Sequence, residues 1–315
     1  MIGLLLAAAL AAPPVHQVAS VDLPPGALRA FADYMNVDAE RHLLYVGYTG
    51  MDQVVAIDLR TNKVMATVPG LPRVHAMVPV PGLGLGFASV GGKAEVAVVD
   101  LKQHAVVGRI PAGEGPDAIL YDAPTGQVYV GNHKGNSATL IDPVARKAIA
   151  TIPLGGAPEY AQADPASGLV YQNLEDTNEL VVVNPRRHQV TARYPLAPGE
   201  GPTGLALDAQ HGRLFAACDN ELLVVLDATT GRRVATAPIG QGVDFVAYDP
   251  GLRRIYTANG KSGDMTVIGQ QDADHYQVLA TIKTFDHAHA LALDPATHRI
   301  YVVHGSQVAV YEATP

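Results

Sequence analysis

Seven polar residues recur along the chain at intervals of 41 to 45 residues, and each is of a type that takes part in ligand binding or proton transfer. They are Asp33, His75, Asp117, Glu159, Thr203, Asp244 and His289. Carboxylates gathered in one place attract a cation or a cationic ligand. They also raise one another's pKa, which brings a carboxyl group into the range where it acts as a general acid or base near neutral pH. The chemistry therefore depends on whether the fold brings the seven side chains together.

Histidines are concentrated near the C-terminus, in the stretch 284–306. If this stretch pairs back on itself around a turn at 294–299, Ala292 lies opposite Tyr301 and His289 lies opposite His304. Directly opposed residues have Cβ atoms about 5 Å apart, which is close enough for two imidazoles to share a ligand. His298 falls in the turn, at the other end of the strands, and is excluded.

His287 lies on the same side as His289 when the strand extends that far, because alternate residues of a strand share a face. A His-x-His pair with a cross-strand histidine suits Zn²⁺ or Cu²⁺. The sequence therefore predicts one divalent metal ion held by His287, His289 and His304, with Asp33 and His75 available to complete the shell. The alternative is a hydrogen-bonded histidine cluster that holds no ion.

The interval between the polar residues is the length of a repeat. The segment "YDAPTGQVYVGNHKGNSATLIDPVARKAIATIPLGGAP" reappears as "ADPASGLVYQNLEDTNELVVVNPRRHQVTARYPLAPGEGP" and again as "LDAQHGRLFAACDNELLVVLDATTGRRVATAPIGQGV". Each unit reads as four short runs of alternating apolar residues separated by turn residues, which is typical of four antiparallel strands. Seven such units without helical interruptions predict an all-β, seven-bladed β-propeller over residues 16–315.

The last unit lacks a fourth strand after "RIYVVHGSQVAVYEATP". The segment "HQVASVDLPPGA" near the N-terminus resembles the fourth strand of unit four, "HQVTARYPLAPGE". We therefore expect residues around 17–23 to lie beside the C-terminal strands. This pairing closes the ring and removes two exposed sheet edges.

Several of the second strands carry a family signature. "LYVGYTG", "VYVGNHKG", "IYTANGKSG" and "IYVVHG" resemble the Tyr-Val-Thr-Asn signature of the YVTN β-propeller repeat proteins, whereas "LGFASVGG", "LVYQNLED" and "LFAACDN" depart from it. The resemblance implies a seven-bladed propeller of a kind commonly exported in bacteria. It does not imply a reaction, because such propellers serve as lactonases, lyases, binding scaffolds and surface proteins.

In a propeller the innermost strand of each blade lines the central channel. The seven recurring residues begin these strands, so we expect four carboxylates, two imidazoles and one hydroxyl around one mouth of the channel. The alternative is a mouth whose polar groups are merely hydrated. A second column, of mixed polarity, ends the second strands at the same mouth: Tyr48, Val90, Asn132, Leu174, Cys218, Asn259 and His304. Glu175, Asp219 and His133 lie in the adjoining loops, where they widen a binding surface or are simply solvated.

Composition limits the partners and the location. The formal net charge is −8, with no run of Lys or Arg, which argues against nucleic-acid binding. The start "MIGLLLAAALAAPPV" has a short apolar core followed by a small-x-small motif, which predicts a signal peptide over residues 1–15 and a periplasmic or secreted protein. The alternative is an apolar tail. No segment is apolar over a length that spans a bilayer.

These observations favour an exported, monomeric propeller that binds a small ligand, a metal ion or a protein partner at its polar mouth without turnover. The alternative is a lactonase- or lyase-type enzyme at the same mouth, with His75 and His289 as acid–base groups. In that case the four carboxylates act as ligands or orienting groups: Asp33, Asp117, Glu159 and Asp244. A third hypothesis is a surface protein that uses the outer edges of its blades. The sequence contains no Walker motif and no GxSxG motif.

Overall fold

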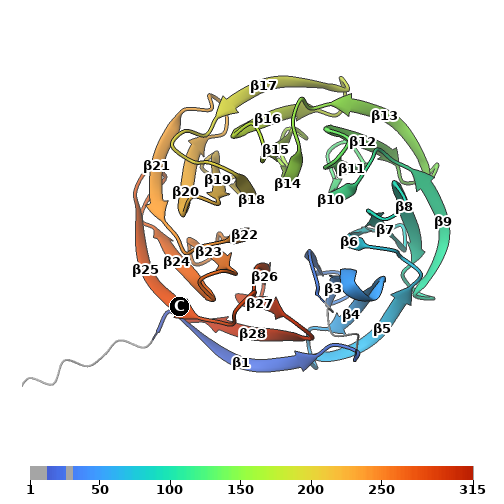
Figure 1. The fold of residues 1–315 in the computed structure, drawn as a ribbon, viewed down its shortest axis with the longest axis horizontal. Helices are drawn as coiled ribbons and strands as arrows, with labels where there is room; N and C mark the ends of the chain where they lie inside the picture. The colour runs from blue at the N-terminus through green and yellow to red at the C-terminus, as the bar shows by residue number, and fades with distance from the viewer. Residues whose placement is uncertain (1–12, 26–30, 315) are drawn as a thin grey trace, which may run out of the picture.

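Seven four-stranded antiparallel sheets are arranged around a central axis as the blades of a propeller (Figure 1). This computed structural model describes residues 13–25 and 31–314, so most of the predicted signal peptide lies outside the described residues. Within the described part, the short 3₁₀ turn η1 (Thr49–Met51) is the one helical element. The predicted all-β, seven-bladed propeller is confirmed.

Each blade runs from an innermost strand at the channel to an outermost strand at the circumference. Blade one comprises β2 (Met35–Asp38), β3 (Leu43–Tyr48), β4 (Gln53–Asp58) and β5 (Lys63–Pro69). Blade two comprises β6 (Val74–Val80), β7 (Leu85–Val90), β8 (Glu95–Asp100) and β9 (Ala105–Pro111). Blade three comprises β10 (Pro116–Asp122), β11 (Gln127–Asn132), β12 (Ser137–Asp142) and β13 (Lys147–Pro153).

The remaining blades repeat this order. Blade four comprises β14 (Pro158–Ala163), β15 (Val170–Leu174), β16 (Glu179–Asn184) and β17 (Gln189–Pro195). Blade five comprises β18 (Pro202–Asp208), β19 (Arg213–Cys218), β20 (Leu222–Asp227) and β21 (Arg233–Pro238). Blade six comprises β22 (Val243–Asp249), β23 (Arg254–Asn259), β24 (Asp264–Gln270) and β25 (Tyr276–Lys283). Blade seven comprises β26 (Ala290–Asp294), β27 (Arg299–His304), β28 (Gln307–Ala313) and β1 (Val15–Asp22).

The burial of each strand follows from its place in the blade. The second and third strands are covered on both faces by neighbouring blades, so strands such as β7 are buried along their whole length. Their sequences therefore read as nearly continuous apolar runs. The outermost strands, such as β9, alternate between partly buried and exposed residues because only one face packs against a neighbour.

In four blades an aspartate closes the hairpin between the third and fourth strands. In blade two, Asp100 Oδ1 accepts the backbone N–H groups of Lys102 and Gln103, both at 2.8 Å. His104 then takes a left-handed conformation with φ of 52°. An aspartate that caps its own turn in this way explains why the repeat carries an acidic residue at the end of most third strands.

The N-terminal strand closes the ring as expected. β1 pairs antiparallel with β28, from Val15 opposite Ala313 to Asp22 opposite Gln307. Beyond the strand, the Leu23 N–H donates to the Ser306 carbonyl at 2.8 Å. Blade seven is therefore built from both ends of the described chain, and β28 is not left as a sheet edge.

Candidate functional site

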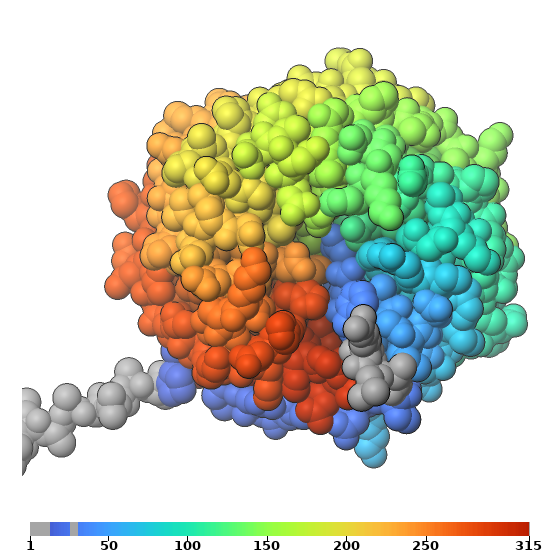
Figure 2. Space-filling view, viewed as in Figure 1, coloured from blue at the N-terminus to red at the C-terminus, as the bar shows by residue number. Residues whose placement is uncertain are grey.

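The seven recurring residues lie at one mouth of the channel, which we call the polar mouth. Five of them are the second residue of an innermost strand, and Asp33 and His289 lie just ahead of the shorter strands β2 and β26. Figure 2 shows one face of the wheel, which is hollowed at its centre. The Tyr34 side chain is buried, and burial together with the negative charges of four carboxylates raises its pKa: Asp117, Glu159, Asp33 and Asp244. Carboxylates from four blades thus act on one phenol near the axis.

The first convergent group joins blades one, two and three. His75 Nδ1 lies 2.7 Å from Asp33 Oδ2 and 3.5 Å from Asp117 Oδ1. Burial would lower the pKa of His75, but the hydrogen bond to Asp33 and the charge of Asp117 outweigh burial and raise the pKa. For Asp117 itself, burial is the main cause of a pKa raised to about 7, and the nearby Asp33 and Glu159 charges act in the same direction.

The second convergent group joins blades three and four. His133 Nδ1 lies 2.8 Å from Glu159 Oε1. This close contact with the Glu159 carboxylate is the main cause of a His133 pKa raised to about 9, against the opposing effect of burial. One ligand atom each from Asp117, His133 and Glu159 lies within 4.8 Å of the others, and the same holds for Asp33, His75 and Asp117. The two groups therefore share Asp117.

Sequence reasoning places His133 only in an adjoining loop, whereas the structure brings it into the site. It directly follows Asn132, the last residue of β11, and its N–H donates to the Gly115 carbonyl at 2.8 Å. That backbone bond fixes the loop against the entry to β10, beside the start of the next blade. The position directly after a second strand, at the polar mouth, is the signal that points to it.

The other side of the polar mouth belongs to blades five, six and seven. Thr203 Oγ1 donates to the Val243 carbonyl at 3.0 Å, so this hydroxyl ties two blades together. His289 Nε2 lies 4.0 Å from Asp244 Oδ2. Burial raises the pKa of Asp244, and the charges of Asp33 and Glu159 add to it. A cavity of about 330 Å³ on this side is lined by Thr203, Asp244 and His289 together with Glu175, Asp219, Lys261 and His287.

The structure does not gather His287, His289 and His304 as a metal site would require. The predicted pairing of Ala292 with Tyr301 is confirmed, but β26 begins at Ala290, so the strand does not extend to His287. The chain turns at His287, where φ is 64°, and the His287 carbonyl accepts a hydrogen bond from His289 Nδ1 at 2.8 Å.

His304 has a packing role at the end of β27. Its ring stacks on Phe285, with ring centroids 3.6 Å apart and an interplanar angle of 12°. The groups of convergent ligand atoms found in the described part of the chain do not include the histidine trio. The prediction of a metal site at these three histidines assumed a strand that extends to His287, and β26 does not extend that far.

A glycine of the family-like signature positions His75. Gly47, in "LYVGYTG", lies so close to blade two that a Cβ atom there would stand 1.9 Å from the His75 carbonyl oxygen. The innermost strand of blade two can pack at this distance only against a residue without a side chain. In the second column, Cys218 is fully buried, and burial raises its pKa to about 12, as expected for an unreactive thiol.

Three aromatic rings from blades one, four and six meet across the channel below the polar mouth. The ring centroid of Tyr34 lies 5.5 Å from that of Tyr160 and 4.8 Å from that of Phe245, and the centroids of Tyr160 and Phe245 are 5.3 Å apart. These three residues directly follow Asp33, Glu159 and Asp244. Because the blades are not neighbours, the contacts span the axis. We call this set the aromatic floor.

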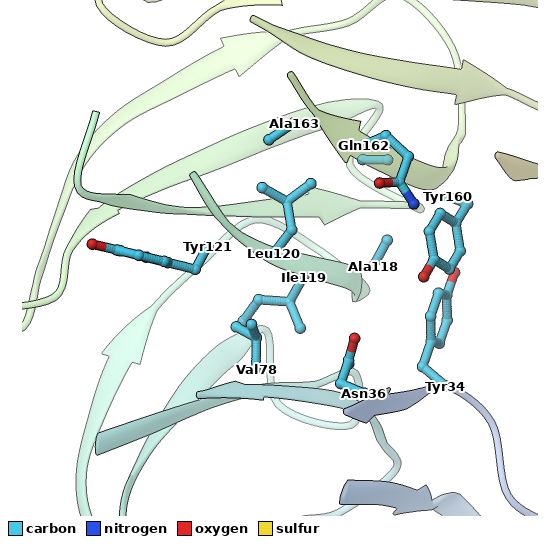
Figure 3. A pocket seen from close by; sticks show the side chains of 11 residues that line it. Tyr34, Asn36, Val78, Ala118, Ile119, Leu120, Tyr121, Tyr160, Gln162 and Ala163 are labelled. Atoms are coloured by element: carbon cyan, nitrogen blue, oxygen red, sulfur yellow. The ribbon is translucent and has the colours of Figure 1, made fainter. Parts of the chain in front are cut away.

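The far side of the aromatic floor contains separate cavities. One, of about 280 Å³, is lined by Tyr34, Asn36, Tyr160 and Gln162 among others, and Figure 3 shows the two tyrosine rings at one end of it. On the opposite side of the floor, a cavity of about 310 Å³ at the polar mouth is lined by His75, Asp117, His133 and Glu159, with Arg73 and Lys134. The cavity at the polar mouth, which we call the cup, is thus separate from the cavity that the tyrosines line.

Comparison with known proteins establishes the fold. No family model matches the chain, and no curated protein matches its sequence. Within the described residues, no helix is long and apolar enough to cross a membrane. Among solved structures, the chain is similar to Kuenenia stuttgartiensis hydrazine synthase (TM-score 0.80, 14% identity, 92% of this chain and 97% of that one). It is also similar to a chain of a mitotic checkpoint complex (TM-score 0.82, 12% identity, 100% of this chain and 99% of that one). At these identities the likeness shows a shared seven-bladed β-propeller fold.

Proposed function

We propose that this propeller is a binding protein that takes a divalent metal ion at its polar mouth. The observation that carries the proposal is the convergence of Asp33, His75 and Asp117 from three consecutive blades, with ligand atoms within 4.8 Å of one another. Two carboxylates and one imidazole form a donor set of intermediate softness. Such a set suits Zn²⁺, Mn²⁺ and other first-row divalent ions.

The donor types favour a metal ion over an organic cation. An organic ammonium ion is commonly held against exposed aromatic faces. Here Tyr34 and Tyr160 stack on each other and Phe245 meets both rings in edge-to-face contacts, so the three rings pack against one another at 4.8–5.5 Å. An imidazole nitrogen, by contrast, has a lone pair that can bind a metal ion directly. Toward an ammonium ion the same lone pair acts only as a hydrogen-bond acceptor.

The scaffold holds these donors in place before any ion arrives. His75 and Asp117 are on innermost strands, and Gly47 allows blade one to pack directly against the His75 backbone. Donors on strands are positioned more accurately than donors on free loops. The aromatic floor closes the cup below them, so an ion enters and leaves by the same mouth.

The test is a titration of chelator-treated protein with Zn²⁺, Mn²⁺, Co²⁺ and Ni²⁺ by calorimetry and thermal melting. A binding ion raises the stability by about 2.7 kcal/mol at one hundred times its dissociation constant. His75→Gln should weaken binding by at least about 10-fold, since even the loss of a group that only supports a ligand costs that much. His275→Gln, an exposed histidine in the β24–β25 turn with 72% of its side chain accessible, is the matched control and should bind normally. Absence of heat and of stabilisation with all four ions at millimolar concentration would overturn the proposal.

A lactonase- or lyase-type activity is the second candidate, favoured by one observation. The pKa of Asp117 is raised to about 7, mainly by burial, and its carboxylate faces His75. A pair of this kind can hold and transfer a proton near neutral pH. Turnover of lactones that is lost in His289→Ala or His75→Gln, with folding intact, supports this candidate. A variant that loses only ion affinity supports binding alone.

We also propose that the protein is exported, on the basis of the apolar N-terminal segment and its small-x-small motif. Fractionation of expressing cells and N-terminal sequencing of the product test this proposal. A product that retains residues 1–12 and stays in the cytoplasm would contradict it.

A further inference from the structure

We propose that the polar mouth holds two divalent ions side by side, with Asp117 as the carboxylate that bridges them. This inference rests on the proposed function of the mouth and adds a second ion with its own ligands. The first ion would take Asp33, His75 and Asp117. The second would take Asp117, His133 and Glu159.

The geometry of the two groups is closely alike. In each, a histidine Nδ1 lies beside a carboxylate oxygen, at 2.7 Å for His75 with Asp33 and at 2.8 Å for His133 with Glu159. In each, the third ligand atom comes from Asp117 and lies within 4.8 Å of the other two. Both groups therefore offer two carboxylates and one imidazole, and neither is richer in donors than the other.

Asp117 has a carboxylate oxygen that is available to bind a cation, as a bridging ligand requires. Its Oδ1 atom is buried and takes part in no hydrogen bond with any residue that the structure describes. His75 Nδ1 lies 3.5 Å from this oxygen without forming a hydrogen bond to it. A buried carboxylate oxygen that accepts no hydrogen bond is costly, and a bound cation removes that cost. The side chain stands between the two histidines, so each of its two oxygens can serve one ion.

The surrounding charge can balance two ions. Asp33, Asp117 and Glu159 supply three carboxylates directly, and Glu175 and Asp244 lie near enough to act on the same groups. Arg73 and Lys134 also line the cup, so the five carboxylates, these two cations and two divalent ions together carry a net charge near zero.

Loading the site requires a small movement. Ligand atoms bound tetrahedrally at ordinary metal distances are about 3.3 Å apart. The two histidine–carboxylate pairs, now at 2.7 and 2.8 Å, would therefore open by about 0.6 Å. Rotation of the side chains supplies a displacement of this size without moving the strands. Two metal ions would replace the present hydrogen bond between His75 and Asp33 and the close contact between His133 and Glu159.

The experiment counts ions and asks whether they are coupled. Chelator-treated full-length protein is equilibrated with Mn²⁺, and the bound metal is measured by elemental analysis and calorimetry. The wild-type chain should bind two ions, whereas His75→Gln and His133→Gln should each bind one. Electron paramagnetic resonance should show a spin-coupled pair in the wild type and an isolated ion in either variant. His275→Gln should retain two coupled ions.

The outcomes separate this inference from the proposed function. One ion per wild-type chain, unchanged in His133→Gln, would refute the second ion and leave the single-ion function intact. No bound ion would refute both. Two ions without magnetic coupling would refute the Asp117 bridge. If His133→Gln does not fold, the stoichiometry and the coupled spectrum of the wild type still decide the question.

Discussion

We expect the closure of the ring to be most sensitive to substitution of Leu23. It follows β1 and is only 4% exposed, and its N–H donates to the Ser306 carbonyl at 2.8 Å. Truncation of a buried leucine to alanine removes its apolar contacts and leaves a cavity, which costs about 2–5 kcal/mol. In a domain of this size each kcal/mol lowers the melting temperature by about 2 °C, so Leu23→Ala should lower it by about 4–10 °C.

The matched control lies on β1 itself. Val18 lies at the bulge of β1 and is 42% exposed, so Val18→Ala should change the stability by no more than about 0.5 kcal/mol. Deletion of residues 16–25 should have the largest effect. It removes the buried side chains of Val21 and Leu23, worth about 3–6 kcal/mol together, which is comparable to half the stability of a typical domain.

Thermal melting by circular dichroism and calorimetry measures these effects. Size-exclusion chromatography of the deletion variant adds a second readout, because β28 then becomes an exposed edge that can pair with another molecule. If the deletion variant melts at the wild-type temperature, or if Leu23→Ala and Val18→Ala lower it equally, β1 does not close the ring in solution and the reasoning fails.

Two further predictions concern the core and the far mouth. Burial would raise the pKa of Asp208, but hydrogen bonds from Gln270 at 2.8 Å and from His211 at 2.7 Å outweigh it and lower the pKa. The folded state therefore gains stability that is fully present above the unfolded pKa of about 4 and is lost as the pH falls through the folded pKa. Asp208→Asn should flatten this dependence of the unfolding free energy on acid pH, measured by urea unfolding. An unchanged dependence would contradict the role of Asp208. Phe245→Ala should remove one ring of the aromatic floor and lower the free energy of unfolding by about 3–5 kcal/mol. A loss below about 1 kcal/mol would show that Phe245 does not pack against Tyr34 and Tyr160 in solution.

The number of blades and the strand register next to the hairpin turns are predictable from the sequence because both depend on local rules. Farther from the turn the innermost strands shift register, so that Pro202 rather than Thr203 lies opposite Cys218. Turn residues recur at a fixed interval, and residues of a hairpin pair symmetrically about its turn, which is why Ala292 lies opposite Tyr301. The closure by β1 follows from the missing fourth strand of the last unit. These features need only the period of a strand and the avoidance of free edges.

The chemistry of the polar mouth is less predictable. The column of polar residues follows from the repeat, but the sharing of Asp117 between two groups depends on loop paths and side-chain directions. The same is true of the aromatic floor, whose rings cross the axis between blades that are far apart in the sequence. The end of a strand is also hard to predict: β26 begins at Ala290, so the strand does not extend to His287 as the expected histidine trio assumed.

Because the ring is closed, the chain could begin at any blade without a change in the arrangement of the sheets. The Thr314 N–H donates to the Pro14 carbonyl at 2.9 Å, so the two ends of the described chain meet at the outer edge of blade seven. A circular permutant that joins residue 314 to residue 13 and opens the chain in any loop between blades would keep every sheet intact. The propeller could thus be reopened at a chosen blade, which would allow a reporter to be placed beside the cup or away from it.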